Sequence, residues 1–224
     1  MGIIFGFICL ICFCALLAKA ITHRYHLEKA DRFLMKFHKC ISGMLAISCF
    51  IHIIFVVPVL KNRSIFVNAT GIASVLFMFL LICLCHMIKD KKKRICWHRV
   101  LAIIMAICAV SHIIAYIVDF KDYQQKVSNI VFDDIELANI KDGVYEGEYD
   151  AGYISARVEV EIKNSEIVSA ILLEHRNERG KSAESILDDV IDKQEIDVDA
   201  VSGATNSSNV IKKAIQIAIK GSKE

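Results

Sequence analysis

Two stretches of the chain, residues 38–54 (HKCISGMLAISCFIHII) and 98–114 (HRVLAIIMAICAVSHII), share one pattern. Each begins with a histidine and a basic residue and continues through apolar and small side chains. Each then carries a second histidine fourteen positions after the first, followed by two isoleucines. In an α-helix, fourteen steps raise a side chain by about 21 Å and return it to within about 40° of the same face. The pattern therefore predicts two helices that each place one histidine near either side of a membrane.

The composition is that of a membrane protein with a more polar C-terminal part. Hydrophobic residues make up 55% of the 224 residues, and most of them precede residue 120. Four segments are long and apolar enough to span a hydrocarbon core of about 30 Å, namely residues 2–18, 40–60, 65–88 and 98–118. The first could also be a signal peptide, but its uncharged start and the lack of a small-residue cleavage site favour a retained anchor. We therefore expect a membrane all-α four-helix bundle over residues 1–120, a linker outside the membrane over 121–140 and a small exported α+β domain over 141–224.

Lysine and arginine are unevenly distributed over the connections between these segments. Six lie between the first and second spans and five between the third and fourth, whereas the second connection has only two. Basic loops remain in the cytoplasm, so both termini and everything after residue 119 are expected outside. The sequence thus predicts a multi-pass protein of the cell membrane, with His38 and His98 near the inner surface and His52 and His112 near the outer one.

The four histidines form two pairs that could each hold an iron atom. A single histidine in a span is as often a core residue or a partner of a neighbouring helix. Here, however, the two helices have the same histidine spacing, and their histidines agree in helix face, in membrane depth and in the kind of side chains beside them. The same face carries small residues that leave room for a flat macrocycle, and bulkier Leu45 and Met105 lie midway between the histidines. Iron with two axial imidazoles is haem chemistry. The small residues are Ser42, Cys49, Ala102 and Ala109.

This arrangement resembles the transmembrane di-haem cytochromes b, including those of quinol-oxidising complexes. The resemblance covers roughly residues 37–113. It implies two haem b groups, with His38 and His98 as axial ligands of the inner haem iron and His52 and His112 as those of the outer one. His86 in the third span has no partner at the helical repeat, and we interpret it as structural or as a quinone or proton contact.

From residue 141 the pattern changes to that of an α+β domain. Residues 157–163 alternate between apolar and charged side chains, which predicts a strand, and 164–165 form a turn into a second strand over 166–175. Helices are predicted over 182–193 and 207–220. Residues 141–224 contain 11 Lys and Arg against 17 Asp and Glu, and this acidic balance argues against a nucleic-acid partner. No cysteine follows Cys108, so we expect no disulfide framework in this domain.

The string Asp199-Ala200-Val201-Ser202-Gly203-Ala204-Thr205 precedes the last predicted helix. Glycine allows close approach of the backbone, and unpaired amides together with the helix dipole favour an anion such as phosphate. An ordinary N-cap is the alternative for a turn rich in Ser and Thr.

The whole string resembles the flavinylation signature of the FMN-binding domain family, as in the C subunit of the sodium-pumping NADH:quinone reductase and the G subunit of Rnf. Asp142-Gly143-x-Tyr145-x-Gly147 and the alternating strand extend the resemblance upstream. It implies that a flavin transferase joins FMN to Thr205 through a phosphodiester bond. Asp199, Ser202, Gly203 and Ala204 would frame this residue for recognition. Asn206-Ser207 departs from the family, where an aromatic residue and a threonine often follow.

Together these features predict a membrane electron-transfer protein. The cytoplasmic loops are too short for a nucleotide-binding domain, and the chain lacks a Gly-rich dinucleotide fingerprint. Electrons are therefore expected from a membrane quinol or a redox partner protein, and would pass through both haems and FMN to an acceptor outside the membrane. Two alternatives lack haem altogether: a membrane anchor for the FMN domain, or a redox-sensor subunit of a larger complex.

Overall fold

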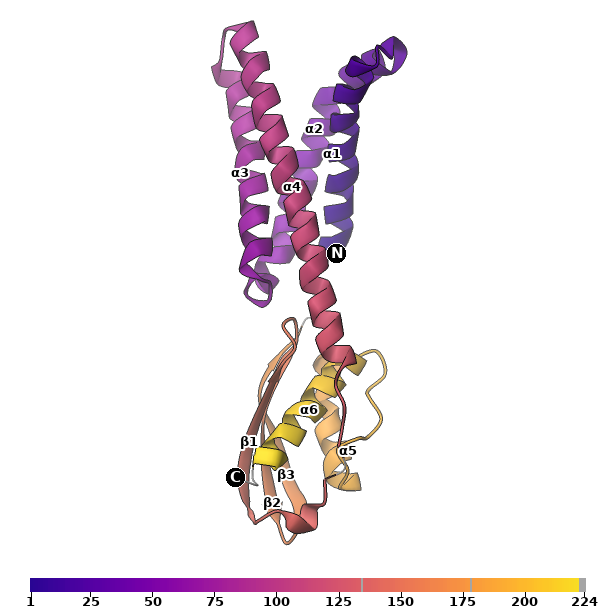
Figure 1. The fold of residues 1–224 in the computed structure, drawn as a ribbon, viewed down its shortest axis with the longest axis vertical. Coiled ribbons are helices and arrows are strands. Elements are labelled where there is room, and N and C mark those ends of the chain that lie inside the picture. Colours follow the sequence, from indigo (N-terminus) through magenta and orange to yellow (C-terminus); the bar gives the residue numbers. More distant parts are fainter. Residues whose placement is uncertain (134, 178, 222–224) are drawn as a thin grey trace. The chain divides into compact units, whose positions relative to one another are not determined.

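The computed structural model describes residues 1–133, 135–177 and 179–221 and contains two compact units, Met1–Ala115 and Tyr116–Glu224 (Figure 1). Unit 1 consists of helices α1 (Gly2–Arg24), α2 (Glu28–Val56), α3 (Ile65–Met87) and the first part of α4 (Lys91–Ser128), with a 3-10 helix, η1 (Val57–Asn62), after α2. All four α-helices are long and apolar enough to cross a membrane. The predicted apolar four-helix region is therefore confirmed at the level of helix length and composition.

The helix ends of unit 1 follow from local chemistry. Pro58 is the only proline of the chain and lies at the start of η1. Its ring and missing N–H disrupt the α-helical hydrogen bonds, which accounts for the end of α2 at Val56. Ser64 caps α3 by accepting a hydrogen bond from the Val67 amide, and the Asp90 carboxylate accepts one from the Lys92 amide at the start of α4. These caps fix where the spans begin.

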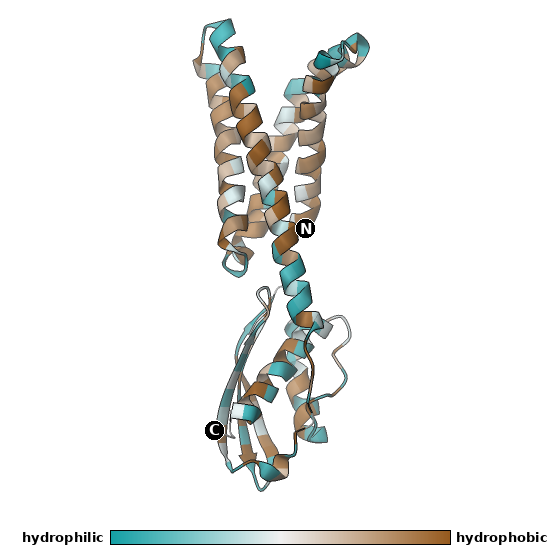
Figure 2. Cartoon of the chain, viewed as in Figure 1, coloured by the Kyte–Doolittle hydropathy of each residue, from teal (hydrophilic) through white to brown (hydrophobic). Residues whose placement is uncertain are grey.

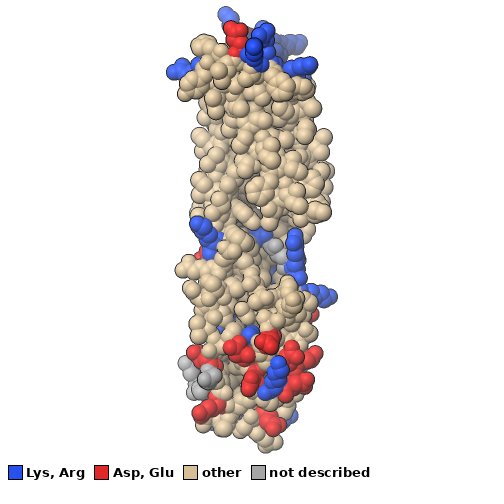
Figure 3. Space-filling view, turned by 90° about the vertical axis from the view of Figure 1, so that its right-hand side faces the viewer, with Lys and Arg blue, Asp and Glu red and all other residues tan. Residues whose placement is uncertain are grey.

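The outer surface of unit 1 suits a hydrocarbon environment. Large apolar side chains point outward along all four helices, for example Phe50 and Ile103, which are more than half exposed. Figure 2 shows apolar residues along most of the helix length, and Figure 3 shows Lys and Arg gathered at the end of unit 1 where α1 joins α2. An apolar surface of this extent would associate in water, whereas lipid tails cover it at no cost.

Unit 2 is built on an antiparallel sheet in the order β1-β2-β3. The strands are β1 (Gly143–Asp150), β2 (Ser155–Lys163) and β3 (Glu166–Arg176). Asn164 and Ser165 connect β2 to β3, and both have positive φ angles (52° and 63°). Two such residues form the tight turn that matches the twist of a hairpin. The predicted hairpin is confirmed.

Two helices, α5 (Ile186–Lys193) and α6 (Thr205–Gly221), complete unit 2 together with the 3-10 helices η2 (Leu137–Asn139) and η3 (Lys181–Ser185). Residues 182–185 of the predicted helix are thus 3-10 helical, and α6 begins two residues earlier than predicted. Helix α6 packs on β1 and β2. A Cβ atom at Gly147 of β1 would lie 2.2 Å from the Ala214 carbonyl oxygen, so this strand can approach α6 only because residue 147 is glycine.

The end of α4 belongs to unit 2. We predicted a linker over 121–140, but α4 is helical through Ser128, and Tyr123 and Val127 are each only 7% exposed within the core of unit 2. The Tyr149 hydroxyl also donates a hydrogen bond to the Lys126 carbonyl. Unit 2 therefore begins about 25 residues before the boundary expected from sequence.

A fragment of residues 116–224 should consequently be more stable than one of 141–224. Burying a large apolar side chain contributes about 1.5–3 kcal/mol, so loss of Tyr123 and Val127 should lower the free energy of unfolding by at least about 3 kcal/mol. Urea unfolding of both fragments measures the difference, and Tyr123→Ala in the longer fragment should reproduce part of it. Equal free energies of unfolding would show that α4 adds nothing to this core.

Candidate functional site

The structure brings together the first histidine pair, His38 of α2 and His98 of α4. Their ring centroids lie 6.2 Å apart, and the ring planes are inclined by 68°. Metal–imidazole bonds are about 2 Å long, so two imidazoles on opposite sides of one iron place their ring centres about 6 Å apart. The observed separation of the ring centres is close to this value.

The second histidine pair, His52 of α2 and His112 of α4, is held by the two flanking helices. His52 Nδ1 lies 2.9 Å from the Gly2 carbonyl oxygen of α1, and His112 Nδ1 lies 3.0 Å from the Val67 carbonyl oxygen of α3. A carbonyl can only accept, so each Nδ1 carries the proton and donates it. In both rings, Nε2 is then the nitrogen left for a metal.

Two bulky residues between the pairs are packed inside unit 1. Leu45 and Met105 are each 8% exposed and belong to one buried cluster that fills the middle of unit 1. The Ser42 hydroxyl donates a hydrogen bond to the His38 carbonyl. Packed side chains thus separate the two histidine levels. His86 is exposed in the last turn of α3.

The two pairs are a poor donor set for a bare metal ion and a suitable one for haem. Among the described residues, no group of three or more His, Cys, Asp or Glu side chains could hold a metal ion. Haem iron requires only two protein ligands, because the macrocycle provides four nitrogens. His38 and His98 together offer the two imidazoles that a haem iron would need, and a haem held there would supply one-electron chemistry.

In unit 2, the motif residues form a tight turn followed at once by α6. The Ala204 amide donates to the Val201 carbonyl (2.9 Å), and Gly203 has a φ of +78°. A hydrogen-bonded turn with positive φ at its third residue is type II, which requires glycine there. Thr205 is the first residue of α6 and is exposed. The turn therefore presents the Thr205 hydroxyl to solvent at a helix N-terminus.

Neighbouring hydroxyls differ sharply in accessibility. Ser202 is exposed in the turn, whereas Ser207 and Ser208 are 2% and 0% exposed. Ser208 Oγ accepts a hydrogen bond from the Val201 amide (3.1 Å) and so ties the turn to α6. Asp199, the first residue of the motif, is exposed in the loop that precedes the turn. Of these side chains, Thr205 and Ser202 are the ones that a modifying enzyme could reach.

An aromatic cluster from α4 lies against the start of α6, which the sequence did not reveal. Asn206 Nδ2 donates to the Tyr123 hydroxyl (2.9 Å). Tyr123 in turn stacks on Tyr153, with ring centroids 4.8 Å apart and planes inclined by 12°, and Phe120 contacts both. The residue after Thr205 is therefore held by an aromatic side chain 83 positions away in the chain.

The loop after β3 supports the same helix end. Gly180 lies against Ser207, since a Cβ at residue 180 would be 1.9 Å from Ser207 Oγ. Asn177 Oδ1 accepts a hydrogen bond from the Gly180 amide (3.1 Å). The neighbouring His175 side chain is only 3% exposed, and its Nδ1 lies 3.1 Å from Glu184 Oε1. No motif in the sequence indicated these contacts.

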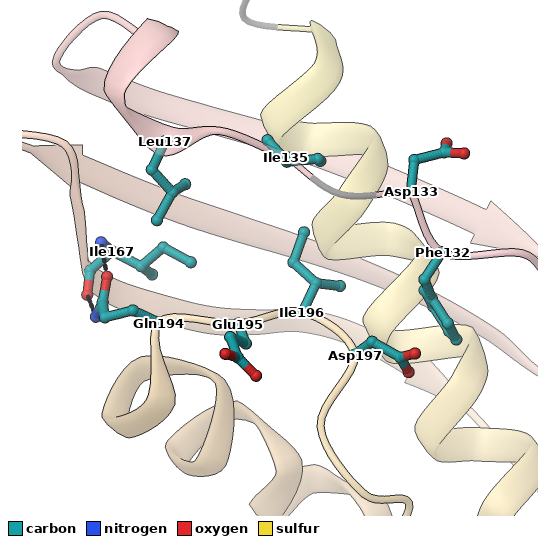
Figure 4. A pocket seen from close by; sticks show the side chains of 9 residues that line it. All are labelled: Phe132, Asp133, Ile135, Leu137, Ile167, Gln194, Glu195, Ile196 and Asp197. Atoms are coloured by element: carbon teal, nitrogen blue, oxygen red, sulfur yellow. Dashed lines mark hydrogen bonds between the residues drawn. The ribbon is translucent and has the colours of Figure 1, made fainter.

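A separate cavity of about 300 Å³ lies in unit 2 beside β3 and α6 (Figure 4). Its polar groups are largely engaged in the fold. Gln194 hydrogen-bonds to the backbone of Ile167, Asp197 pairs with Lys212 (2.9 Å), and the Lys220 ammonium holds the pKa of Asp133 below its usual range. None of the motif residues lines the cavity, so it is not part of the candidate site.

Comparison with known families gives one match, which lies in unit 2. Residues 151–220 match the family model of the FMN-binding domain. The match covers β2, β3, α5, the turn and Thr205, and begins after β1. It supports FMN as the cofactor of this unit and suggests a role in flavin-based electron transfer. The comparisons with curated proteins and with solved structures found no match.

Proposed function

We propose that the protein carries electrons across a membrane, from a quinol or a redox partner protein through two haem b groups to an FMN bound covalently to Thr205, and on to an acceptor outside. His38 and His98 ligate the inner haem, and His52 and His112 the outer one. The observation that carries the proposal is the 6.2 Å separation of the first pair in a chain that also contains an FMN-binding domain.

The membrane orientation follows from charge. The two connections rich in Lys and Arg would lie in the cytoplasm, so unit 2 would lie outside. A quinol in the bilayer can reach unit 1 from the lipid phase, which removes the need for a nucleotide-binding domain. The protein is thus an electron-transfer or oxidoreductase subunit whose donor and acceptor are separate molecules.

The residues of unit 2 would hold the flavin in place. Thr205 offers a hydroxyl to a flavin transferase at the N-terminus of α6, where backbone amides and the helix dipole favour a phosphate. Asp199, Ser202, Gly203 and Ala204 form the frame that the transferase recognises, and Tyr123 fixes Asn206 beside the attachment point. FMN supplies the redox chemistry, while the protein supplies placement and electrostatics.

Anaerobic addition of a quinol analogue to right-side-out membrane vesicles tests this path. The haem absorbance should change first and the flavin absorbance second. His52→Ala should slow flavin reduction by about tenfold or more, a barrier increase of about 1.4 kcal/mol. Added ferricyanide, which does not cross membranes, should reoxidise the flavin in these vesicles but not in inverted ones. Flavin reduction without any haem signal would instead support a haem-free anchor or sensor.

A further inference from the structure

The two histidines of the second pair meet the same backbone motif on two different helices. His52 contacts the Gly2 carbonyl of α1, and Gly6 lies one turn further on. His112 contacts the Val67 carbonyl of α3, and Gly71 lies one turn further on. In each case a carbonyl at position i is followed by a glycine at position i+4 that also touches the imidazole.

Helix geometry explains why a glycine at this position leaves the carbonyl uncovered. Each Cα–Cβ bond of a helix tilts toward the N-terminus, so a side chain at i+4 covers the carbonyl of residue i. A Cβ atom at Gly71 would lie 3.0 Å from His112 Cε1 and 3.2 Å from Nδ1. At Gly6 it would lie 3.3 Å from His52 Cε1 and 3.4 Å from Nδ1. A larger residue would therefore displace the ring from the carbonyl, more severely at residue 71.

The hydrogen bond has a chemical consequence for the imidazole. A helical carbonyl that already accepts from its own i+4 amide still has a second lone pair for an Nδ1–H donor. Donation from Nδ1 fixes the tautomer and the ring orientation, and it raises the basicity of Nε2 as a metal ligand. A carbonyl on each flanking helix thus sets which nitrogen of each histidine faces a metal.

We propose that Gly6 and Gly71 are positioning residues of the second histidine pair, each uncovering a helical carbonyl that orients an imidazole for iron ligation through Nε2. The identity of the ligand at Nε2 rests on the proposed function, whereas the hydrogen bonds do not. Thr70 adds a weaker contact to the same ring, with its hydroxyl 3.4 Å from His112 Nδ1.

Three glycine-to-alanine variants of the full-length protein provide a matched test. Gly43 of α2 is the control, because a Cβ there meets nothing within 4 Å. Alanine favours a helix over glycine by about 1 kcal/mol at all three sites, so helix propensity alone predicts no loss. We expect Gly71→Ala to lower the haem content by about half and Gly6→Ala to shift the low-spin EPR signal of the outer haem. Gly43→Ala should have the same haem content and the same EPR signals as the unmodified protein.

Two readouts separate this inference from the proposed function. Retention of the first-pair haem and of FMN shows that a variant is folded, and if Gly71→Ala does not accumulate in membranes, the milder Gly6→Ala decides. Unchanged outer-haem content and EPR signals in both variants would overturn the role of the glycines while leaving the electron path intact. If the unmodified protein binds no haem, ¹⁵N NMR of labelled histidine still reports the tautomer. Nδ1–H forms at His52 and His112 support the inference if Gly71→Ala alters that of His112 and Gly6→Ala that of His52, and Nε2–H forms refute it.

Discussion

Thr205→Ala is expected to abolish covalent attachment of FMN while leaving the haem spectrum of the full-length protein unchanged. The substitution removes the hydroxyl that would be esterified by the phosphate, and Thr205 is exposed, so its loss leaves no cavity in unit 2. Intact-protein mass spectrometry after co-expression with a flavin transferase measures the effect. The unmodified chain should keep its flavin in denaturant, and the variant should have the mass of the polypeptide alone.

Three further substitutions make this test specific for the site. Thr205→Ser keeps a hydroxyl and should retain modification at lower yield. Ser202→Ala removes the other exposed hydroxyl of the motif. Because Ser202 belongs to the proposed recognition frame, the yield should fall, but the flavin that is attached should still be on Thr205. Gly203→Ala places a side chain at a φ of +78°, which strains the turn by about 1–2 kcal/mol and should reduce the yield. A flavin found on Ser202, or no flavin in any of these proteins, would refute Thr205 as the attachment residue.

The sequence predicts those features that depend on local periodicity. The fourteen-residue spacing of histidines anticipated that His38 would meet His98, because equal spacing on neighbouring helices places side chains at equal heights. The turn before α6 could likewise be predicted, since glycine adopts the positive φ angle found at Gly203 without the steric cost that other residues pay. Residues 207–220 had the apolar stripe of a helix, although the first turn, which contains Thr205, lacked one.

Features that depend on tertiary contacts could not be read in this way. Hydropathy indicates where a membrane segment ends, not where its helix ends, so the polar residues after 118 concealed the continuation of α4 to Ser128. The bond from Asn206 to Tyr123 joins residues 83 positions apart. The carbonyls of Gly2 and Val67 carry no side-chain signal at all, and only the glycines one turn later mark them in the sequence.

Loss of haem from single histidine variants is the second large effect that we expect. His38→Ala or His98→Ala should remove the inner haem, and His52→Ala or His112→Ala the outer one, so each variant should contain about half the haem of the unmodified protein. The reason is that each iron has only two protein ligands, and a haem held by one imidazole binds weakly or becomes high-spin. Haem assays on purified protein and low-temperature EPR measure content and spin state.

Position-specific controls distinguish ligation from a structural role of these histidines. His86→Ala should retain both haems, because His86 is exposed at the end of α3 and belongs to neither pair. Replacement of His38 by glycine leaves a space that free imidazole can enter, so added imidazole should restore the low-spin spectrum of the inner haem. A structural histidine would not be rescued in this way.

The two levels are separated by packed Leu45 and Met105, so each substitution should affect only its own haem. Full haem content with unchanged low-spin signals in all four single variants would show that the paired histidines pack the bundle and do not bind iron.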